Sequence, residues 1–267
     1  MADEDGRAVT LDQRTPAVVE LFGPALGQIV AFHDLLAVEG VTRGLIGPRE
    51  VPRLWERHLV NSAAVARFLP AEGVVIDVGS GAGLPGVVLA AMRPDLEVVL
   101  LEPMQRRVTW LTEVIERLEL PNTRVTRGRA EDLVGSVLAD AVTARAVAPM
   151  DRLAAWTIPL LRHGGVLLAL KGSRAAEELA AARMSIADLG GDAGDVLDAE
   201  TVPGGEPTTV VRVRRTAPSV PLRPEPTRGA GSSSRPTGPS APGSGHSPRR
   251  IPGGRSPRRG KRGGAGA

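Results

Sequence analysis

Apolar residues recur along the chain with two different periods. Residues 16–39 and 52–69 show helical spacing, and Pro52 suits the first position of a helix. Farther along, short β-branched or apolar runs alternate with helical segments. The predicted strands are 74–76, 98–101, 123–126, 139–143, 166–170 and 208–213, and the predicted helices between them are 87–92, 106–120 and 174–189. Strands that alternate with helices predict an α/β fold with a mostly parallel sheet covered on both faces.

Charge is divided unevenly between two parts of the 267-residue chain. Residues 216–267 carry ten basic side chains and one acidic one, whereas residues 1–215 carry 23 basic and 29 acidic side chains. The C-terminal part also holds ten prolines, eleven glycines and eight serines, so it has too little apolar surface to offset the entropy of ordering. We therefore predict an acidic globular domain over residues 1–215 and a basic disordered tail over residues 216–267.

Composition excludes several classes of protein. The chain has no cysteine, which excludes disulfides, thiolate metal sites and cysteine nucleophiles, and we expect no metal site. The first residues, Met1-Ala2-Asp3-Glu4-Asp5, are acidic where a secretory signal needs a basic region, and no stretch approaches the roughly 20 apolar residues that span a bilayer. We expect a cytoplasmic protein with no membrane contact. The sequence leaves self-association open, with a monomer as the expectation.

A glycine-rich loop follows the first strand of the predicted sheet. In the run from Val74 to Gly86, four glycines lie between a buried strand and an apolar helix. Glycine lets the backbone approach a ligand closely, and the start of the following helix offers free N–H groups to a negative ligand group. We interpret this segment as a ligand-binding loop rather than a tight turn without a ligand.

Two nucleoside cofactors fit this loop. Gly81 to Gly86 match G-x-G-x-x-G, the dinucleotide fingerprint, and Glu102 is placed to accept the ribose hydroxyls of either NAD or S-adenosylmethionine. Asp77 favours S-adenosylmethionine, because a carboxylate before the first glycine can meet the cationic amino group of the methionine moiety. Pro85 favours it too, since it stiffens the turn and removes one N–H donor.

Several motifs together resemble those of one enzyme family. Besides the glycine loop they are Arg57-His58-Leu59, Asn61-Ser62, Leu84-Pro85-Gly86, Leu101-Glu102-Pro103, Arg106-Arg107, Arg129-Ala130-Glu131, Ala144-Arg145-Ala146 and Leu170-Lys171-Gly172. Across residues 40–213 the chain is similar to the bacterial 16S rRNA guanine-N7 methyltransferases, the glucose-inhibited division protein B family of class I S-adenosylmethionine-dependent methyltransferases. The resemblance implies N-terminal helices over 16–69 and a Rossmann-like core over 70–215, with seven strands and the last one antiparallel.

The resemblance also implies roles for individual residues. The cofactor-binding residues would be Asp77, Gly79, Gly81, Leu84, Glu102, Ala130, Glu131 and Arg145. Glu102 would hold the ribose, Ala130 and Glu131 would meet the adenine, and Arg145 would face the crevice at the carboxyl end of its strand. Taken alone, Glu102 fits a solvated loop acid and Arg145 a surface ion-pair partner equally well. Their register with the glycine loop favours the site.

Methylation of guanine N7 needs positioning rather than acid–base catalysis. N7 has a free lone pair at neutral pH, so we expect catalysis to come from holding N7 in line with the breaking C–S bond. Arginine often grips guanine at both O6 and N7, which would block the nucleophile here, so a donor to O6 alone is required. Lys171 and Arg145 are the positioning candidates, with a Glu or Asp for the opposite edge of the base.

Clusters of arginine provide candidate RNA contacts on this acidic domain. Arg53 and Arg57 stand four residues apart on a predicted helix and share a face with Arg49, although an ordinary solvated face shows the same pattern. His58 either contacts RNA or is a half-buried histidine between the front helices. Further clusters expected to position phosphates are Arg124, Arg127 and Arg129, and Arg212, Arg214 and Arg215. The candidate substrate residues are Arg53, Arg57, His58 and Arg129.

The predicted tail allows two interpretations. Segments such as Ser247-Pro248-Arg249-Arg250 would attract RNA electrostatically without sequence preference. A solvated extension with no specific role is the other interpretation, which we favour slightly. The family's core pattern has no counterpart for this tail. A second departure is Glu206-Pro207, where many relatives carry an Arg, so a substrate contact there is in doubt.

The function expected from the resemblance is methyl transfer from S-adenosylmethionine to N7 of a guanine in 16S rRNA of the small ribosomal subunit. One alternative is a methyltransferase of the same fold that acts on a small molecule or a protein. Another is an NAD-binding oxidoreductase, which Asp77, Pro85 and the lack of a convincing general acid disfavour. An RNA-binding assembly factor with an inactive cofactor site is also open.

Overall fold

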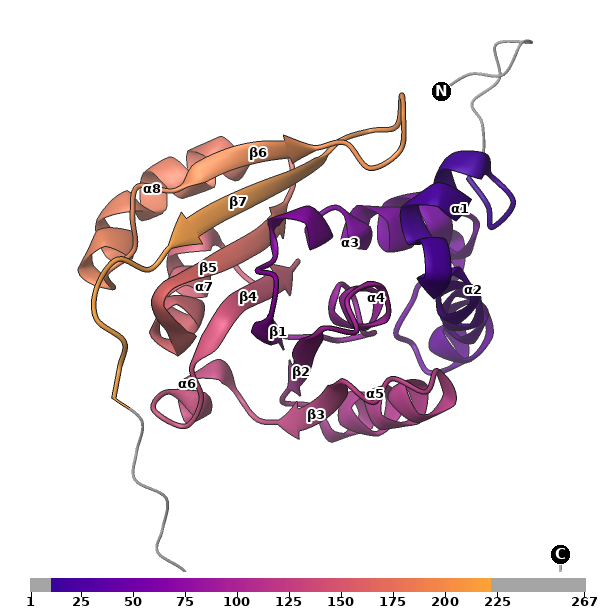
Figure 1. Cartoon of the computed structure of the whole chain (residues 1–267), viewed down its shortest axis with the longest axis horizontal. Coiled ribbons are helices and arrows are strands. Elements are labelled where there is room, and N and C mark those ends of the chain that lie inside the picture. Colours follow the sequence, from indigo (N-terminus) through magenta and orange to yellow (C-terminus); the bar gives the residue numbers. More distant parts are fainter. Residues whose placement is uncertain (1–10, 222–267) are drawn as a thin grey trace, which may run out of the picture. The chain divides into compact units, whose positions relative to one another are not determined.

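A twisted seven-stranded sheet forms the centre of the computed structural model, which describes residues 11–221 (Figure 1). The strand order is β3-β2-β1-β4-β5-β7-β6, and β7 runs antiparallel to both of its neighbours. The strands are β1 (Gly73–Val78), β2 (Leu96–Glu102), β3 (Thr123–Arg127), β4 (Ala139–Arg145), β5 (Leu161–Lys171), β6 (Asp195–Ala199) and β7 (Thr208–Arg214). This arrangement confirms the predicted Rossmann-like α/β fold with an antiparallel last strand.

Helices cover both faces of the sheet (Figure 1). They are α1 (Pro16–Phe22), α2 (Leu26–Leu35), α3 (Asn61–Ala63), α4 (Gly86–Met92), α5 (Gln105–Arg117), α6 (Ala130–Leu133), α7 (Met150–Thr157) and α8 (Ala175–Asp188). Successive residues of a strand point to opposite faces, so β1 contributes to two apolar cores. Val75 packs with α1 to α5, and Ile76 packs with α6, α7 and α8.

The sequence predicted most of these elements but missed three. All six predicted strands are present within a few residues of their expected bounds. The unpredicted strand β6 is a mostly exposed sheet edge, where two aspartates interrupt the apolar pattern. Helices α6 and α7 span only four and eight residues, too few for a clear helical period.

The predicted helix over residues 52–69 is instead a series of short helical segments. A 3-10 helix over Pro48–Arg53 contains Pro52, a π-helical segment follows over Leu54–Val60, and α3 and a 3-10 turn over Ala66–Phe68 complete the series. Proline has no N–H to donate to the preceding turn, which limits how regular a helix can be around it. Trp55 and Leu59 are buried, whereas Ala66 and Leu69 are partly exposed, so the predicted inward face is present mainly in the first half of this region.

The helical stretch Pro16–Gly40 is long and apolar enough to cross a membrane by length and composition, since an 18-residue window within it has a mean hydropathy of 1.5 and 28% of that window is buried. The expectation that no stretch reaches that length was therefore wrong. The same apolar residues have another role, because Phe22, Ile29, Phe32 and Leu36 are buried in the core that covers α4 and β1.

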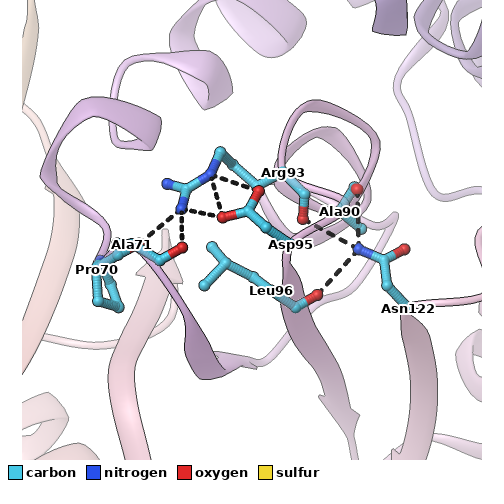
Figure 2. A network of polar contacts seen from close by, with 7 residues as sticks. All are labelled: Pro70, Ala71, Ala90, Arg93, Asp95, Leu96 and Asn122. Carbon is cyan, nitrogen blue, oxygen red and sulfur yellow. Dashed lines mark hydrogen bonds and ion pairs between the residues drawn. The ribbon is translucent and has the colours of Figure 1, made fainter.

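Polar side chains fasten the loops at the edge of the sheet where the parallel strands begin (Figure 2). Arg93 donates to the carbonyls of Pro70 and Ala71, at 2.7 and 3.0 Å, and pairs with Asp95. Nearby, Asn122 Nδ2 lies 3.0–3.1 Å from three carbonyl oxygens, those of Ala90, Arg93 and Leu96. We call this the amino edge of the sheet, and the opposite edge, where the parallel strands end, the carboxyl edge.

Candidate cofactor and substrate site

The glycine loop leaves β1 at the carboxyl edge and turns directly into α4. Gly79 donates its N–H to the carbonyl of Leu101 at 2.9 Å, which fixes the loop against the end of β2. At Gly83, φ is +107°, and a Cβ atom would lie 2.8 Å from Val87 Cγ2. At Gly86, a Cβ atom would lie 2.3 Å from Leu100 Cδ2. Glycine is therefore required at both positions, by conformation and close packing at the first and by close packing at the second.

Asp77, on β1, binds the end of this loop through a backbone N–H group. The residue is 1% exposed, and its carboxylate accepts hydrogen bonds from the N–H of Gly86 at 3.1 Å and from Thr143 Oγ1 at 3.0 Å. Thr143 is the register partner of Asp77 on β4, which brings the two side chains together. Burial raises the pKa of Asp77 to about 6, although these hydrogen bonds act to lower it. The carboxylate therefore fixes the start of α4, and its predicted contact with the cofactor's amino group stays a prediction.

Glu102 links the glycine loop to the end of β2. Its Oε2 accepts the N–H of Gly81 and its Oε1 accepts the N–H of Met104, both at 3.0 Å. Arg107 Nη1 lies 3.7 Å from Oε2. Each carboxylate oxygen has two lone pairs, so both oxygens retain capacity for a further donor such as a ribose hydroxyl.

A cavity of about 310 Å³ opens between the loop and the ends of β2, β3 and β4. It is lined by Val78, Gly79, Leu101, Glu102, Pro103, Met104, Arg107, Gly128, Arg129, Ala130, Glu131, Arg145, Ala146, Val147 and Trp156. A volume of this order is at the lower end of the range for small-molecule sites. Five predicted cofactor residues, Gly79, Glu102, Ala130, Glu131 and Arg145, are thus brought together around one cavity. Asp77, Gly81 and Leu84 do not line it, and Leu84 is buried in the core.

The lining fits a nucleoside cofactor. Glu102 offers carboxylate oxygens to hydroxyl groups, and apolar walls from Met104, Val147 and Trp156 suit a flat ring. The Nε atom of Arg107 is buried and has no hydrogen-bond partner among residues 11–221, which leaves a donor available beside the cavity. Sequence reasoning missed these lining residues, although Arg107 belongs to a motif that it recognised.

Arg145 connects this cavity to the N-terminal segments. Its Nη1 donates to the carbonyl of Arg57 at 3.3 Å, and its Nη2 lies 3.1 Å from His58 Nδ1. On the other side of the ring, His58 Nε2 lies 3.0 Å from Glu50 Oε2. Burial lowers the pKa of His58, and the Arg145 charge lowers it further. His58 is half-buried and stands between Glu50 and Arg145, and its contact with RNA stays a prediction.

Lys171, the other positioning candidate, has partners of its own. Its Nζ donates to the carbonyl of Ala148 and to Glu178 Oε2, both at 2.7 Å, and its side chain is 10% exposed. Lys171 does not line the cofactor cavity. The structure therefore brings Arg145, but not Lys171, to this cavity.

The predicted arginine clusters lie in different places, some near the cofactor cavity and some far from it. Arg53, Arg57 and Arg129 are exposed, and Arg129 lines the cofactor cavity. The expectation that Arg212, Arg214 and Arg215 lie near the site was wrong, because β7 is antiparallel and ends at the amino edge. There Arg212 pairs with Asp195, and the buried Arg215 donates to the carbonyl of Ile158. Arg124, near the start of β3, pairs with Glu97.

Comparison with known proteins identifies the family. The model of the GidB family, rRNA small subunit methyltransferase G, matches residues 25–200. The chain belongs to the GidB family. Its relatives include the ribosomal RNA small subunit methyltransferase G of Beutenbergia cavernae, which is 56% identical over 194 residues, 73% of this chain and 92% of the relative. The protein of the same name from Thermobifida fusca is 56% identical over 200 residues, 74% of this chain and 83% of the relative.

Membership of the GidB family confirms the predicted family and enzyme class, an S-adenosylmethionine-dependent methyltransferase. It also removes the alternative of an NAD-binding oxidoreductase. Among solved structures, the chain is similar to an S-adenosylmethionine-dependent O-methyltransferase from Thermotoga maritima, with a TM-score of 0.47, 15% identity, and coverage of 63% of this chain and 70% of that one. The GidB match spans every element that lines the cofactor cavity.

Proposed function

We propose that this protein transfers a methyl group from S-adenosylmethionine to N7 of a specific guanine in 16S rRNA of the small ribosomal subunit. The observation that carries the proposal is the cavity at the carboxyl edge, in which Gly79, Glu102, Ala130 and Arg145 meet. In a chain of the rRNA small subunit methyltransferase G family, such a cavity is the natural place for the cofactor.

The lining residues suggest how the cofactor is held. Glu102 would accept the ribose hydroxyls with its remaining lone pairs, while its bonds to Gly81 and Met104 keep the carboxylate fixed. The turn at Ala130 and Glu131 would face the adenine, and the glycine loop at Gly79 would face the methionine side. When bound, S-adenosylmethionine supplies an electrophilic methyl group on a positively charged sulfur.

The chemistry at the acceptor requires no proton transfer. Guanine N7 gives its lone pair to the new bond, the electron pair of the broken C–S bond stays on sulfur, and the positive charge moves to the base. The residues therefore need to orient the base and exclude water. Arg145 is the better of the two candidates for donating to O6, because it lines the cavity, whereas the Lys171 ammonium is held by Glu178.

The remaining expectations concern partners. Exposed Arg53, Arg57 and Arg129 would contact phosphates of the RNA, which positions the substrate without reading its sequence. We propose that the protein works as a monomer in the cytoplasm and that its substrate is 16S rRNA, either naked or in the small subunit.

The predicted division into a domain over 1–215 and a tail over 216–267 is also a proposal. Almost all of that tail lies outside the described residues, although Thr216 and Ser219 still bond to the domain.

A single labelling experiment tests the proposal. The full chain is incubated with S-adenosylmethionine labelled in the methyl group and, in separate reactions, with naked 16S rRNA, intact small subunits or total cell protein. We expect label in 16S rRNA from one or both of the first two reactions. Label in protein alone, or no label in any reaction, would contradict the proposal. The same reactions with S-adenosylmethionine but no acceptor give the background.

A further inference from the structure

A second cavity adjoins the cofactor cavity and has a different chemical character. It has a volume of about 550 Å³, and Ala146 lines both cavities. Its walls carry the carboxylates of Glu50, Glu56 and Glu206, together with Arg57 and His58. Because three carboxylates outnumber the single guanidinium, the cavity disfavours a phosphate group but suits a neutral ligand edge that presents N–H donors.

Arg145 and His58 join the two cavities through one chain of hydrogen bonds. A guanidinium can only donate, so the 3.1 Å contact from Arg145 Nη2 requires His58 Nδ1 to be the acceptor. The proton of the neutral ring is then on Nε2, which donates to Glu50 Oε2 at 3.0 Å. The lowered pKa of His58, caused first by burial, favours this neutral ring. Arg145 lines the cofactor cavity and Glu50 lines the second one.

These hydrogen bonds orient the Glu50 carboxylate and leave one of its two oxygens free to accept a hydrogen bond from a ligand. Oε2 is bonded to His58, and Oε1 accepts no hydrogen bond from any residue between 11 and 221. The His58 hydrogen bond also lowers the pKa of Glu50, so the group stays ionised at neutral pH. Glu50 is thus an oriented, charged acceptor in the cavity that adjoins the cofactor cavity.

We propose that the second cavity receives the target guanine and that Glu50 reads its Watson–Crick edge. This inference rests on the proposed function. Guanine presents two adjacent donors on that edge, N1–H and the N2 amino group, which match a carboxylate, whereas adenine presents an acceptor at N1. Enzymes that modify a base read it in this way after it leaves the stack. The negative charge of Glu50 also stabilises the positive charge that the ring acquires on methylation, while N7 remains unobstructed.

His58 is a positioning residue in this arrangement. It holds Glu50 from the side of Arg145, so the carboxylate that reads the base and the arginine beside the cofactor are fixed relative to each other. Recognition of the base edge is thereby coupled to the position of the cofactor.

The test pairs Glu50→Gln with removal of the N2 amino group from the substrate. RNA that carries inosine in place of the methylated guanine keeps N1–H, O6 and N7 but lacks the amino donor. For the wild-type protein we expect kcat/KM to fall about tenfold to hundredfold on the inosine RNA, the cost of a hydrogen bond to a charged group. Glu50→Gln should lower kcat/KM on guanine RNA by a similar factor, and inosine should then lower it no further than about threefold.

Controls separate recognition from folding. Affinity for S-adenosylmethionine, measured by calorimetry, should be unchanged in Glu50→Gln, which would show that the variant is folded with an intact cofactor cavity. Glu20→Gln removes an exposed carboxylate from α1, outside both cavities, and should behave as the wild type.

The inference is overturned if Glu50→Gln keeps wild-type turnover or retains the full inosine penalty. It is also overturned if Glu56→Gln or Glu206→Gln abolishes that penalty instead. A wild-type protein that methylates no RNA would overturn the proposed function, and this inference with it.

Discussion

The two edges of the same sheet use charged residues in different ways. At the amino edge, Arg93 and Asn122 bind backbone carbonyls of neighbouring loops, and Arg93 is paired with Asp95 (Figure 2). At the carboxyl edge, Asp77 and Glu102 bind backbone N–H groups of the glycine loop. Polar and charged side chains thus fix loops at both edges, but at the carboxyl edge the fixed loop encloses one side of the cavity that gathers the predicted cofactor residues.

The two edges differ in which hydrogen-bonding groups remain unpaired beside the cofactor cavity once the loops are fixed. At the amino edge, the donors of Asn122 are all shared among three carbonyls, and the buried Nε of Arg212, which also has no partner among the described residues, lies outside the cofactor cavity. At the carboxyl edge, Glu102 keeps unused lone pairs and the buried Nε of Arg107 has no partner among the described residues. Substitutions at the amino edge should therefore change stability, whereas those at the carboxyl edge should change binding and turnover.

The largest expected effect is that of Arg145→Met. Removing the guanidinium deletes the donor proposed for O6 and the bond that orients His58. We expect kcat to fall about a hundredfold to a thousandfold, as when a fixed donor is removed from an active site. Steady-state kinetics on 16S rRNA measure this, with thermal unfolding as the check on folding. Wild-type kcat in a folded variant would contradict the role given to Arg145.

The next effect concerns the pH dependence of stability at the carboxyl edge. Burial raises the pKa of Asp77 from an ordinary value of 3.8 to about 6, so the folded state binds this proton more tightly than the unfolded state. The resulting stabilisation is complete below pH 3.8 and is lost as the pH rises through 6. Relative to Asp77→Asn, which does not titrate, the wild-type free energy of unfolding should fall by up to about 3 kcal/mol between pH 4 and pH 7.

Urea unfolding of both proteins at a series of pH values measures this difference, and the other carboxyl groups cancel in the comparison. A difference that stays constant with pH, or one that rises, would show that burial does not control the Asp77 proton.

Gly86→Ala tests the close packing beneath the loop. The added methyl group would meet Leu100 Cδ2 and the Asp77 carboxylate, so we expect a loss of about 1–3 kcal/mol in the free energy of unfolding and weaker cofactor binding. Gly27→Ala is the matched control, because its methyl group meets nothing within 4 Å in helix α2 and alanine favours a helix. Equal stability of the two variants would contradict the packing argument.

The smallest of these effects is expected at the amino edge. Asn122→Ala removes the donors shared by three carbonyls and should lower the free energy of unfolding by about 1–2 kcal/mol. Affinity for S-adenosylmethionine should not change. If cofactor affinity falls together with stability, the functional separation of the two edges is wrong.

Local patterns predicted the scaffold of the site, and long-range partners explain what they missed. The β-branched runs and the glycine spacing are visible in a short window, so β1, its loop and α4 were predicted. The contact between Arg145 and His58 joins residues 87 positions apart, and Lys171 reaches the carbonyl of Ala148 across 23 positions. Spacing along the chain does not reveal such contacts. The predicted antiparallel direction of the last strand already places its final residues at the amino edge, so the expected position of Arg212, Arg214 and Arg215 near the site did not follow from the predicted topology.

The central claim is that this protein methylates guanine N7 in 16S rRNA with S-adenosylmethionine. The most direct measurement is mass spectrometry of nucleosides from 16S rRNA that has been incubated with the full chain and methyl-labelled S-adenosylmethionine. We expect the label in 7-methylguanosine from a single position of the RNA. Label in another nucleoside, or none in the RNA, would contradict it.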